Sequence, residues 1–113
     1  MHILKTDPEP FTQTYNGLKN FEIRKHDRAF MEGDTILLRE TKHSGAEMEQ
    51  GMPLIYTGRE IECEIQYILH GPQYGLKDGW IIMSIEATKC SSKPFDDIKF
   101  IEEPSNDNNA EQT

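Results

Sequence analysis

Cysteine and long hydrophobic runs are both scarce in this sequence, and their scarcity excludes several classes of protein. The 113 residues include two cysteines, Cys63 and Cys90, too few for a disulfide framework or a zinc site. The longest apolar run is Trp80-Ile81-Ile82-Met83, whereas a membrane helix needs about 20 such residues. The N-terminal residues lack the pattern of a signal peptide. We therefore expect a cytoplasmic protein that contacts no membrane, with Cys63 as a buried thiol.

Basic residues are also scarce relative to acidic ones. The chain has 12 Lys and Arg against 20 Asp and Glu, a formal net charge of −8. This balance argues against a protein that coats nucleic acids or binds membranes through a basic surface. Residues 87–113 hold six acidic and three basic residues, but Gly17–Arg28 holds four basic and two acidic ones. A small cationic site on an acidic body therefore remains compatible with the sequence.

The periodicity of apolar residues predicts four or five strands and one early helix. The expected strands cover residues 2–5, 20–24, 35–40, 60–69 and 80–86, and Phe21 and Ile23 mark a half-buried face of the second. Pro8 and Pro10 favour a helix start, and the helical face that we expect to be buried holds Phe11, Tyr15 and Leu18. Residues 41–57 are expected to form a loop or a long hairpin.

The strand over residues 60–69 has the clearest alternation. Its apolar face is expected to hold Ile61, Cys63, Ile65, Tyr67 and Leu69, opposite a polar face of Glu60, Glu62, Glu64 and Gln66. The elements together predict an α+β fold, a small mixed β-barrel or strongly curved sheet with one or two short helices. We expect a domain over residues 1–88, a C-terminal arm over 89–103 packed on it, and a polar, disordered tail over 104–113.

Residues Gly17 to Arg24 follow the pattern G-x-K-x-x-E-x-R, which resembles the signature of the ASCH family, a branch of the PUA-like superfamily. Further blocks resemble a small ASCH-like branch of bacteria and their phages: His2-x-Leu4-Lys5, Phe21-Glu22-x-Arg24-Lys25-x-Asp27-Arg28, Gly33-Asp34, Leu38-x-Glu40, Tyr56-Thr57-Gly58-Arg59-Glu60 and Tyr74-Gly75-Leu76-Lys77-x-Gly79. The resemblance implies a PUA-like barrel with a cleft beside the signature and a ligand that is RNA or a nucleotide.

The resemblance also implies an enzymatic alternative. Some ASCH enzymes remove an acyl group from N-acetylated cytidine, and their signature lysine and a threonine three residues later are thought to be catalytic. Lys19 matches that lysine, but Glu22 occupies the threonine position. Other ASCH members resemble ribonucleases. If the chain is an enzyme, we expect a hydrolase of modified nucleosides or RNA, with Lys19 and Glu22 as its catalytic residues.

The signature residues also suggest a site without reference to any family. Glu22 and Arg24 point to the same side of an extended strand, and Lys19 points to the other. Lys19 can join them if it lies in the turn after Gly17, before the strand becomes regular. The three would then form a cation–carboxylate–cation array able to hold a phosphate or a base edge. The alternative is a surface ion pair between Glu22 and Arg24.

Other residues complete the expected binding site. Further cations are Lys5, Lys25, Arg28 and Arg59. The aromatic residues Tyr56, Tyr74 and Trp80 lie at loop–strand junctions where a ring can stack on a base, although packing in the core is favoured for Trp80. The four histidines lack ligand spacing, so we expect no metal and no cofactor. The expected partners of a monomeric protein are RNA, single-stranded nucleic acid or a nucleotide. Another possibility is a phage or mobile-element regulator that binds a host protein through its acidic surface.

Overall fold

The computed structural model describes residues 1–92 and shows five strands and two short helices. In chain order the elements are β1 (His2–Thr6), α1 (Pro8–Tyr15), β2 (Phe21–Lys25), β3 (Thr35–Thr41), α2 (Gly45–Glu49), β4 (Tyr56–His70) and β5 (Trp80–Ser92). The strand expected to end at residue 86 thus continues to Ser92. The rest of the proposed C-terminal arm and the proposed tail lie outside the described residues.

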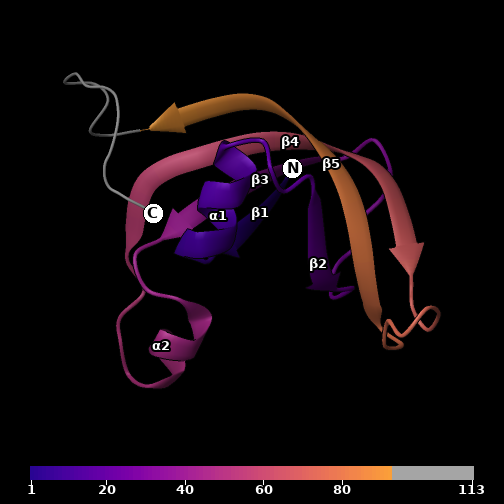
Figure 1. Cartoon of the computed structure of the whole chain (residues 1–113), viewed down its shortest axis with the longest axis horizontal. Coiled ribbons are helices and arrows are strands. Elements are labelled where there is room, and N and C mark those ends of the chain that lie inside the picture. The colour runs from indigo at the N-terminus through magenta and orange to yellow at the C-terminus, as the bar shows by residue number, and fades with distance from the viewer. Residues whose placement is uncertain (93–113) are drawn as a thin grey trace.

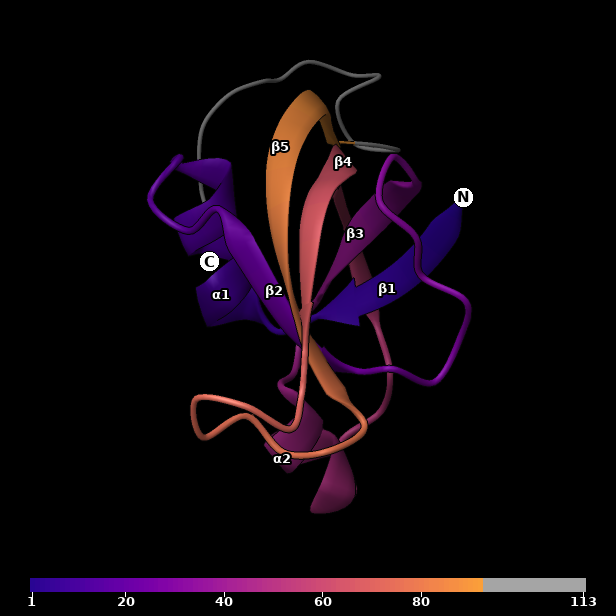
Figure 2. The same ribbon diagram turned by 90° about the vertical axis from the view of Figure 1, so that its right-hand side faces the viewer.

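The five strands form one mixed sheet in the order β1-β3-β4-β5-β2. β1 runs parallel to β3, and the other neighbouring pairs are antiparallel. The long strands β4 and β5 arch over α1 (Figure 1), and the view turned by 90° shows how far the sheet is twisted (Figure 2). The sheet curls into a half-barrel, so the expectation of a small α+β fold with a strongly curved sheet and one or two short helices is confirmed.

The hydrophobic core fills the concave face of the sheet. Alternate residues along the strands point to this face. Phe11 of α1 is buried against it. The buried apolar residues are Leu4, Phe11, Phe30, Ile36, Leu38, Ile61, Cys63, Ile65, Ile68, Ile81, Met83 and Ile85. Their burial provides the main favourable free energy of folding. Cys63 is fully buried, as expected.

The expected orientation of β2 is wrong. Phe21 and Ile23 are exposed, whereas Glu22 between them is 3% exposed and lies on the concave face opposite Met83. Alternation with a period of two identifies two faces but not which of them is buried. Here the buried face is the polar one, because cationic side chains compensate the carboxylate. The expected burial of Tyr15 and Leu18 is also wrong: the helix ends at Tyr15, and both residues are exposed.

Two further expectations need correction. The segment 41–57 contains helix α2, whose N-cap Ser44 and Glu47 form a capping box. In β4, the register against β5 shifts between Ile65 and Tyr67, so Ile68 is buried and Tyr67 is exposed. An extra residue in one strand moves all later side chains to the opposite face. The apolar face expected for the strand over 60–69 therefore holds only as far as Ile65.

None of the helices within residues 1–92 is long and apolar enough to cross a membrane.

Candidate functional site

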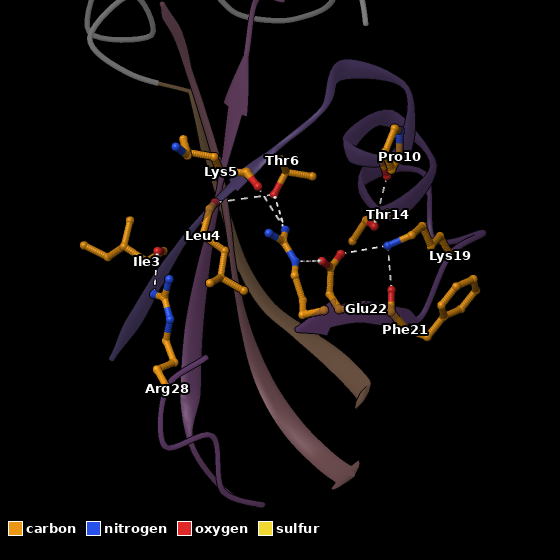
Figure 3. A network of polar contacts seen from close by, with 11 residues as sticks. Ile3, Leu4, Lys5, Thr6, Pro10, Thr14, Lys19, Phe21, Glu22 and Arg28 are labelled. Atoms are coloured by element: carbon orange, nitrogen blue, oxygen red, sulfur yellow. Dashed lines mark hydrogen bonds and ion pairs between the residues drawn. The ribbon is translucent and has the colours of Figure 1, made fainter. Parts of the chain in front are cut away.

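The curl of the sheet brings its two edge strands, β1 and β2, close to each other. Arg24 on β2 donates from Nη2 to the backbone carbonyl of Lys5 on β1 at 2.9 Å, and the same nitrogen lies 3.4 Å from Thr6 Oγ1. Arg28, just beyond β2, donates from Nη1 to the carbonyl of Ile3 at 3.2 Å. Figure 3 shows the contacts of Ile3, Lys5 and Thr6 along this edge. Two arginines thus connect strand edges that no backbone ladder joins.

Glu22 is the buried centre of this contact network. Its side chain is 4% exposed, and its two oxygens accept from different cations. Lys19 Nζ donates to Oε2 at 2.7 Å, and Arg24 Nε donates to Oε1 at 2.9 Å. A buried carboxylate is tolerated when it is paired and hydrogen-bonded. The expected cation–carboxylate–cation array therefore exists, and it contains the ion pair between Glu22 and Arg24, with the carboxylate buried instead of lying on the surface.

Lys19 reaches Glu22 because it precedes the regular part of β2. Helix α1 ends at Tyr15, and Gly17 follows with φ +78°, a backbone conformation that glycine adopts without steric cost. The chain turns there, and Lys19 Nζ also donates to the carbonyl of Phe21 at 2.6 Å. Figure 3 shows Lys19 entering from the α1 side to meet both acceptors. The chain therefore has the turn after Gly17 that was expected to let Lys19 join Glu22 and Arg24.

A pocket of about 470 Å³ lies between β1 and β2, and we call it the seam pocket. It is lined by Leu4, Lys5, Thr6, Asp7, Pro10, Lys19, Phe21, Glu22, Ile23, Arg24, Lys25, Asp27, Arg28, Phe30 and Trp80. Five of these side chains are cationic and three are anionic, a formal charge of +2. The remaining charged residues of the chain therefore total −10, given the overall charge of −8. The seam pocket concentrates positive charge on an acidic protein.

Several donors of the residues that line the seam pocket are not used by the described part of the protein. Within residues 1–92, the side chains of Lys5 and Lys25 make no ion pair or hydrogen bond, and both residues are exposed. A protonated lysine has three donors, and Lys19 uses two of them on Glu22 and Phe21. Arg24 directs Nε and Nη2 at protein acceptors. Glu22 thus holds two cations in place without consuming all of their donors.

Three of the residues expected at the site lie outside the seam pocket. Arg59 contacts the rings of Phe11 and Tyr15, and its Nη1 is 3.6 Å from a carboxylate oxygen of Glu40. The ring of Tyr56 stacks against the guanidinium of Arg39, with 3.8 Å between that group and the ring centre. Tyr74 is 91% exposed in the connection between β4 and β5. The structure therefore gathers Lys5, Lys19, Glu22, Arg24, Lys25 and Arg28 and leaves these three apart.

Glu40 forms a second buried polar cluster that sequence reasoning missed. It is 2% exposed, and Thr57 Oγ1 donates to its Oε1 at 2.7 Å. Burial raises the pKa of the Glu40 carboxyl above its ordinary value, while the Thr57 hydrogen bond and the charge of Arg59 oppose that rise. Glu40 follows buried Leu38 by two residues in β3. That spacing is a signal that could have placed Glu40 on the concave face.

The seam pocket also contains residues that the sequence analysis did not select. Thr6 and Phe30 line it, and both are buried. Thr6 follows Leu4 at strand spacing, which would have placed it on the same face; Phe30 lies outside any regular element and gave no such signal. Trp80, expected as a packing residue or a stacking surface, lines the pocket while half-buried. In residues 1–92, no group of three or more His, Cys, Asp or Glu side chains is arranged to hold a metal ion.

Comparison with known proteins identifies the family of this chain but does not indicate an activity. A search of the curated proteins found no match to this chain. A family model described as a domain of unknown function, DUF3850, matches residues 1–85. That match covers strands β1 to β4, the start of β5 and every residue of the seam pocket. The chain belongs to the DUF3850 family.

Proposed function

We propose that this DUF3850 domain is an RNA- or nucleotide-binding module of the ASCH and PUA-like type, and that it binds its ligand in the seam pocket. The observation that carries the proposal is that five cationic residues line one pocket of an acidic chain. Lys19 and Arg24 are fixed there by a buried carboxylate. Side chains held in place before a ligand arrives lose less conformational entropy on binding.

The size and the walls of the seam pocket suit a nucleotide. Small-molecule sites usually measure roughly 300–1,000 Å³ and combine apolar walls with a few placed polar groups. The seam pocket measures about 470 Å³, and its apolar walls include Phe21, Ile23 and Trp80. A base can contact the apolar walls while arginine and lysine donors bind phosphate oxygens.

Equilibrium binding to short single-stranded RNA, short single-stranded DNA and nucleotides tests the proposal. The most informative variant combines Lys5→Gln and Lys25→Gln, because neither side chain has a partner within residues 1–92 whose loss would perturb the fold. Lys42→Gln is the matched control, since Lys42 is exposed and lies outside the seam pocket. We expect the double variant to weaken binding about tenfold or more and the control to bind like the wild type.

Two results would contradict the proposal. One is the absence of binding to any of these ligands, which would favour the protein-partner alternative. The other is equal binding by the wild type and the double variant, which would place the ligand elsewhere. Circular dichroism and thermal unfolding show whether each variant is folded.

A second candidate function is hydrolysis of a modified nucleoside or RNA. The observation that favours it is the 2.7 Å contact between Lys19 Nζ and Glu22 on the pocket wall, since proton transfer requires groups within hydrogen-bonding reach. Chromatographic assay of N-acetylated cytidine and of a labelled RNA tests it, with Lys19→Gln as the variant. Turnover that disappears in this variant supports hydrolysis. Absence of turnover at high protein concentration contradicts it and leaves the binding proposal intact.

A further inference from the structure

We infer that the seam pocket selects a terminal phosphate, a phosphomonoester on a nucleoside, over the internal phosphates of a nucleic-acid strand. This inference rests on the proposed function and specifies the ligand of the same site. The group can come from two sources, a free nucleoside monophosphate or the phosphorylated end of a single strand. The charge of the pocket lining, the contacts of two arginines and the size of the pocket support it.

The charge of the seam pocket matches a monoester better than a diester. The pocket lining carries a formal +2, from Lys5, Lys19, Arg24, Lys25 and Arg28 against Asp7, Glu22 and Asp27. A phosphomonoester carries about −1.5 to −2 at neutral pH, whereas each phosphate within a strand carries one negative charge. A bound monoester would therefore neutralise the pocket, and an internal phosphate would leave it positive.

Two guanidinium groups contact neighbouring positions on the same edge strand of the seam pocket. Arg24 contacts the carbonyl of Lys5, and Arg28 contacts the carbonyl of Ile3, two residues earlier on the same strand. Carbonyls two residues apart along a strand are roughly 7 Å apart. The other N–H groups of the two guanidiniums can contact one phosphate, since a charged N–H···O contact is about 2.8 Å long. A terminal phosphate offers three free oxygens for such contacts, one more than an internal phosphate.

The overall charge of the chain and the size of the seam pocket disfavour a long strand. The charged residues outside the pocket total −10 over the whole chain. A protein of net negative charge repels a long polyanion. The pocket volume of about 470 Å³ also leaves room for little more than one nucleotide. The seam pocket therefore accommodates the end of a nucleic-acid strand better than its interior.

The experiment compares ligands that differ in the position of one phosphate. Fluorescence anisotropy at fixed ionic strength measures the affinity of one four-nucleotide RNA with a 5′-phosphate, with a 3′-phosphate and with hydroxyl groups at both ends. Nucleoside 5′-monophosphates and the corresponding nucleosides serve as competitors. Arg28→Gln is the test variant, because Arg28 is exposed and its polar contacts are an exposed ion pair with Asp27 and one hydrogen bond to the Ile3 carbonyl; thermal unfolding shows whether the variant is folded. Lys42→Gln is the matched control.

We expect at least one of the phosphorylated RNAs to bind about tenfold more tightly than the RNA with two hydroxyl ends. Arg28→Gln should remove most of that difference, and Lys42→Gln should keep it. Competition by nucleoside monophosphates but not by nucleosides would show that the free nucleotide is also a ligand. Equal affinity for all three RNAs would overturn this inference while leaving the proposed function standing. Binding of none of the RNAs or nucleotides would overturn both.

Discussion

Glu22 and Arg24 lie two residues apart on the concave face of an edge strand, and Arg24 Nε donates to the Glu22 carboxylate at 2.9 Å. From this position the guanidinium extends to the backbone carbonyl of Lys5 across the gap to β1. The buried acid therefore orients the arginine that connects the two edges of the half-barrel. The same contact that stabilises the curled sheet also forms one wall of the seam pocket.

Replacement of Glu22 should destabilise the fold strongly. Glu22→Ala leaves Lys19 and Arg24 without their shared partner, although both are partly exposed and can be hydrated. We expect a loss of about 3 kcal/mol in the free energy of unfolding, measured by urea denaturation. The matched control is Glu64→Ala on the exposed face of β4, with an expected change below about 0.5 kcal/mol. Equal losses in the two variants would contradict the central role of Glu22.

Glu40 should make stability fall as the pH rises. Burial raises its pKa in the folded chain, so the folded state holds this proton more tightly than the unfolded state does. Its contribution is therefore present at low pH and is lost as the pH increases from about 4 through the raised pKa. Thermal unfolding of the wild type and of Glu40→Gln from pH 4 to pH 8 isolates this contribution. The wild type should lose stability relative to the variant as the pH rises, and a constant difference would refute the expectation.

The two cysteines should differ in reactivity. Burial, reinforced by the negative charge of Glu22, raises the pKa of Cys63 to about 12. Partial burial of the thiol also raises the pKa of Cys90, but this residue is exposed. Because the thiolate is the reactive form, a maleimide at pH 8 should label Cys90 first and Cys63 only on unfolding. Rapid labelling of folded Cys90→Ser protein would contradict the buried position of Cys63.

Tyr74 should be replaceable without loss of stability. It has φ +52° in a two-residue turn with Gly75, and Gln73 and Leu76 exchange backbone hydrogen bonds across that turn. Positive φ costs most residues roughly 1 kcal/mol or more, and asparagine tolerates it better. Tyr74→Asn should leave the free energy of unfolding unchanged or raise it by up to about 1 kcal/mol, whereas Gly75→Ala should lower it. A clear loss in Tyr74→Asn would show that the ring packs on the domain.

Much of the strand pattern and part of the site could be predicted from the sequence. Glycine at position 17 indicated the turn that lets Lys19 approach Glu22, and the alternation from Ile61 to Ile65 indicated the concave face of β4. These features depend on local backbone preferences and on short-range periodicity. They therefore appear in a single sequence without knowledge of the tertiary contacts.

The inverted face of β2 could not be predicted in this way. Glu22 is buried because Lys19, Arg24 and the edge of β1 surround it, and that arrangement depends on the curl of the whole sheet. The bulge after Ile65 is likewise set by the pairing of β4 with β5. Helix α2 differs, because Ser44 and Glu47 have the spacing of a capping box and could have revealed it.

The most direct test of the seam pocket as a nucleotide or RNA site is an NMR titration of the isotopically labelled chain. A nucleoside 5′-monophosphate and a short single-stranded RNA are added separately, and backbone amide shifts are followed. The account predicts saturable shifts concentrated in β1, β2 and the segment through Phe30, with α2 and the outer face of β4 unaffected. Shifts confined to α2 or the acidic face of β4, or no shifts with either ligand, would contradict it.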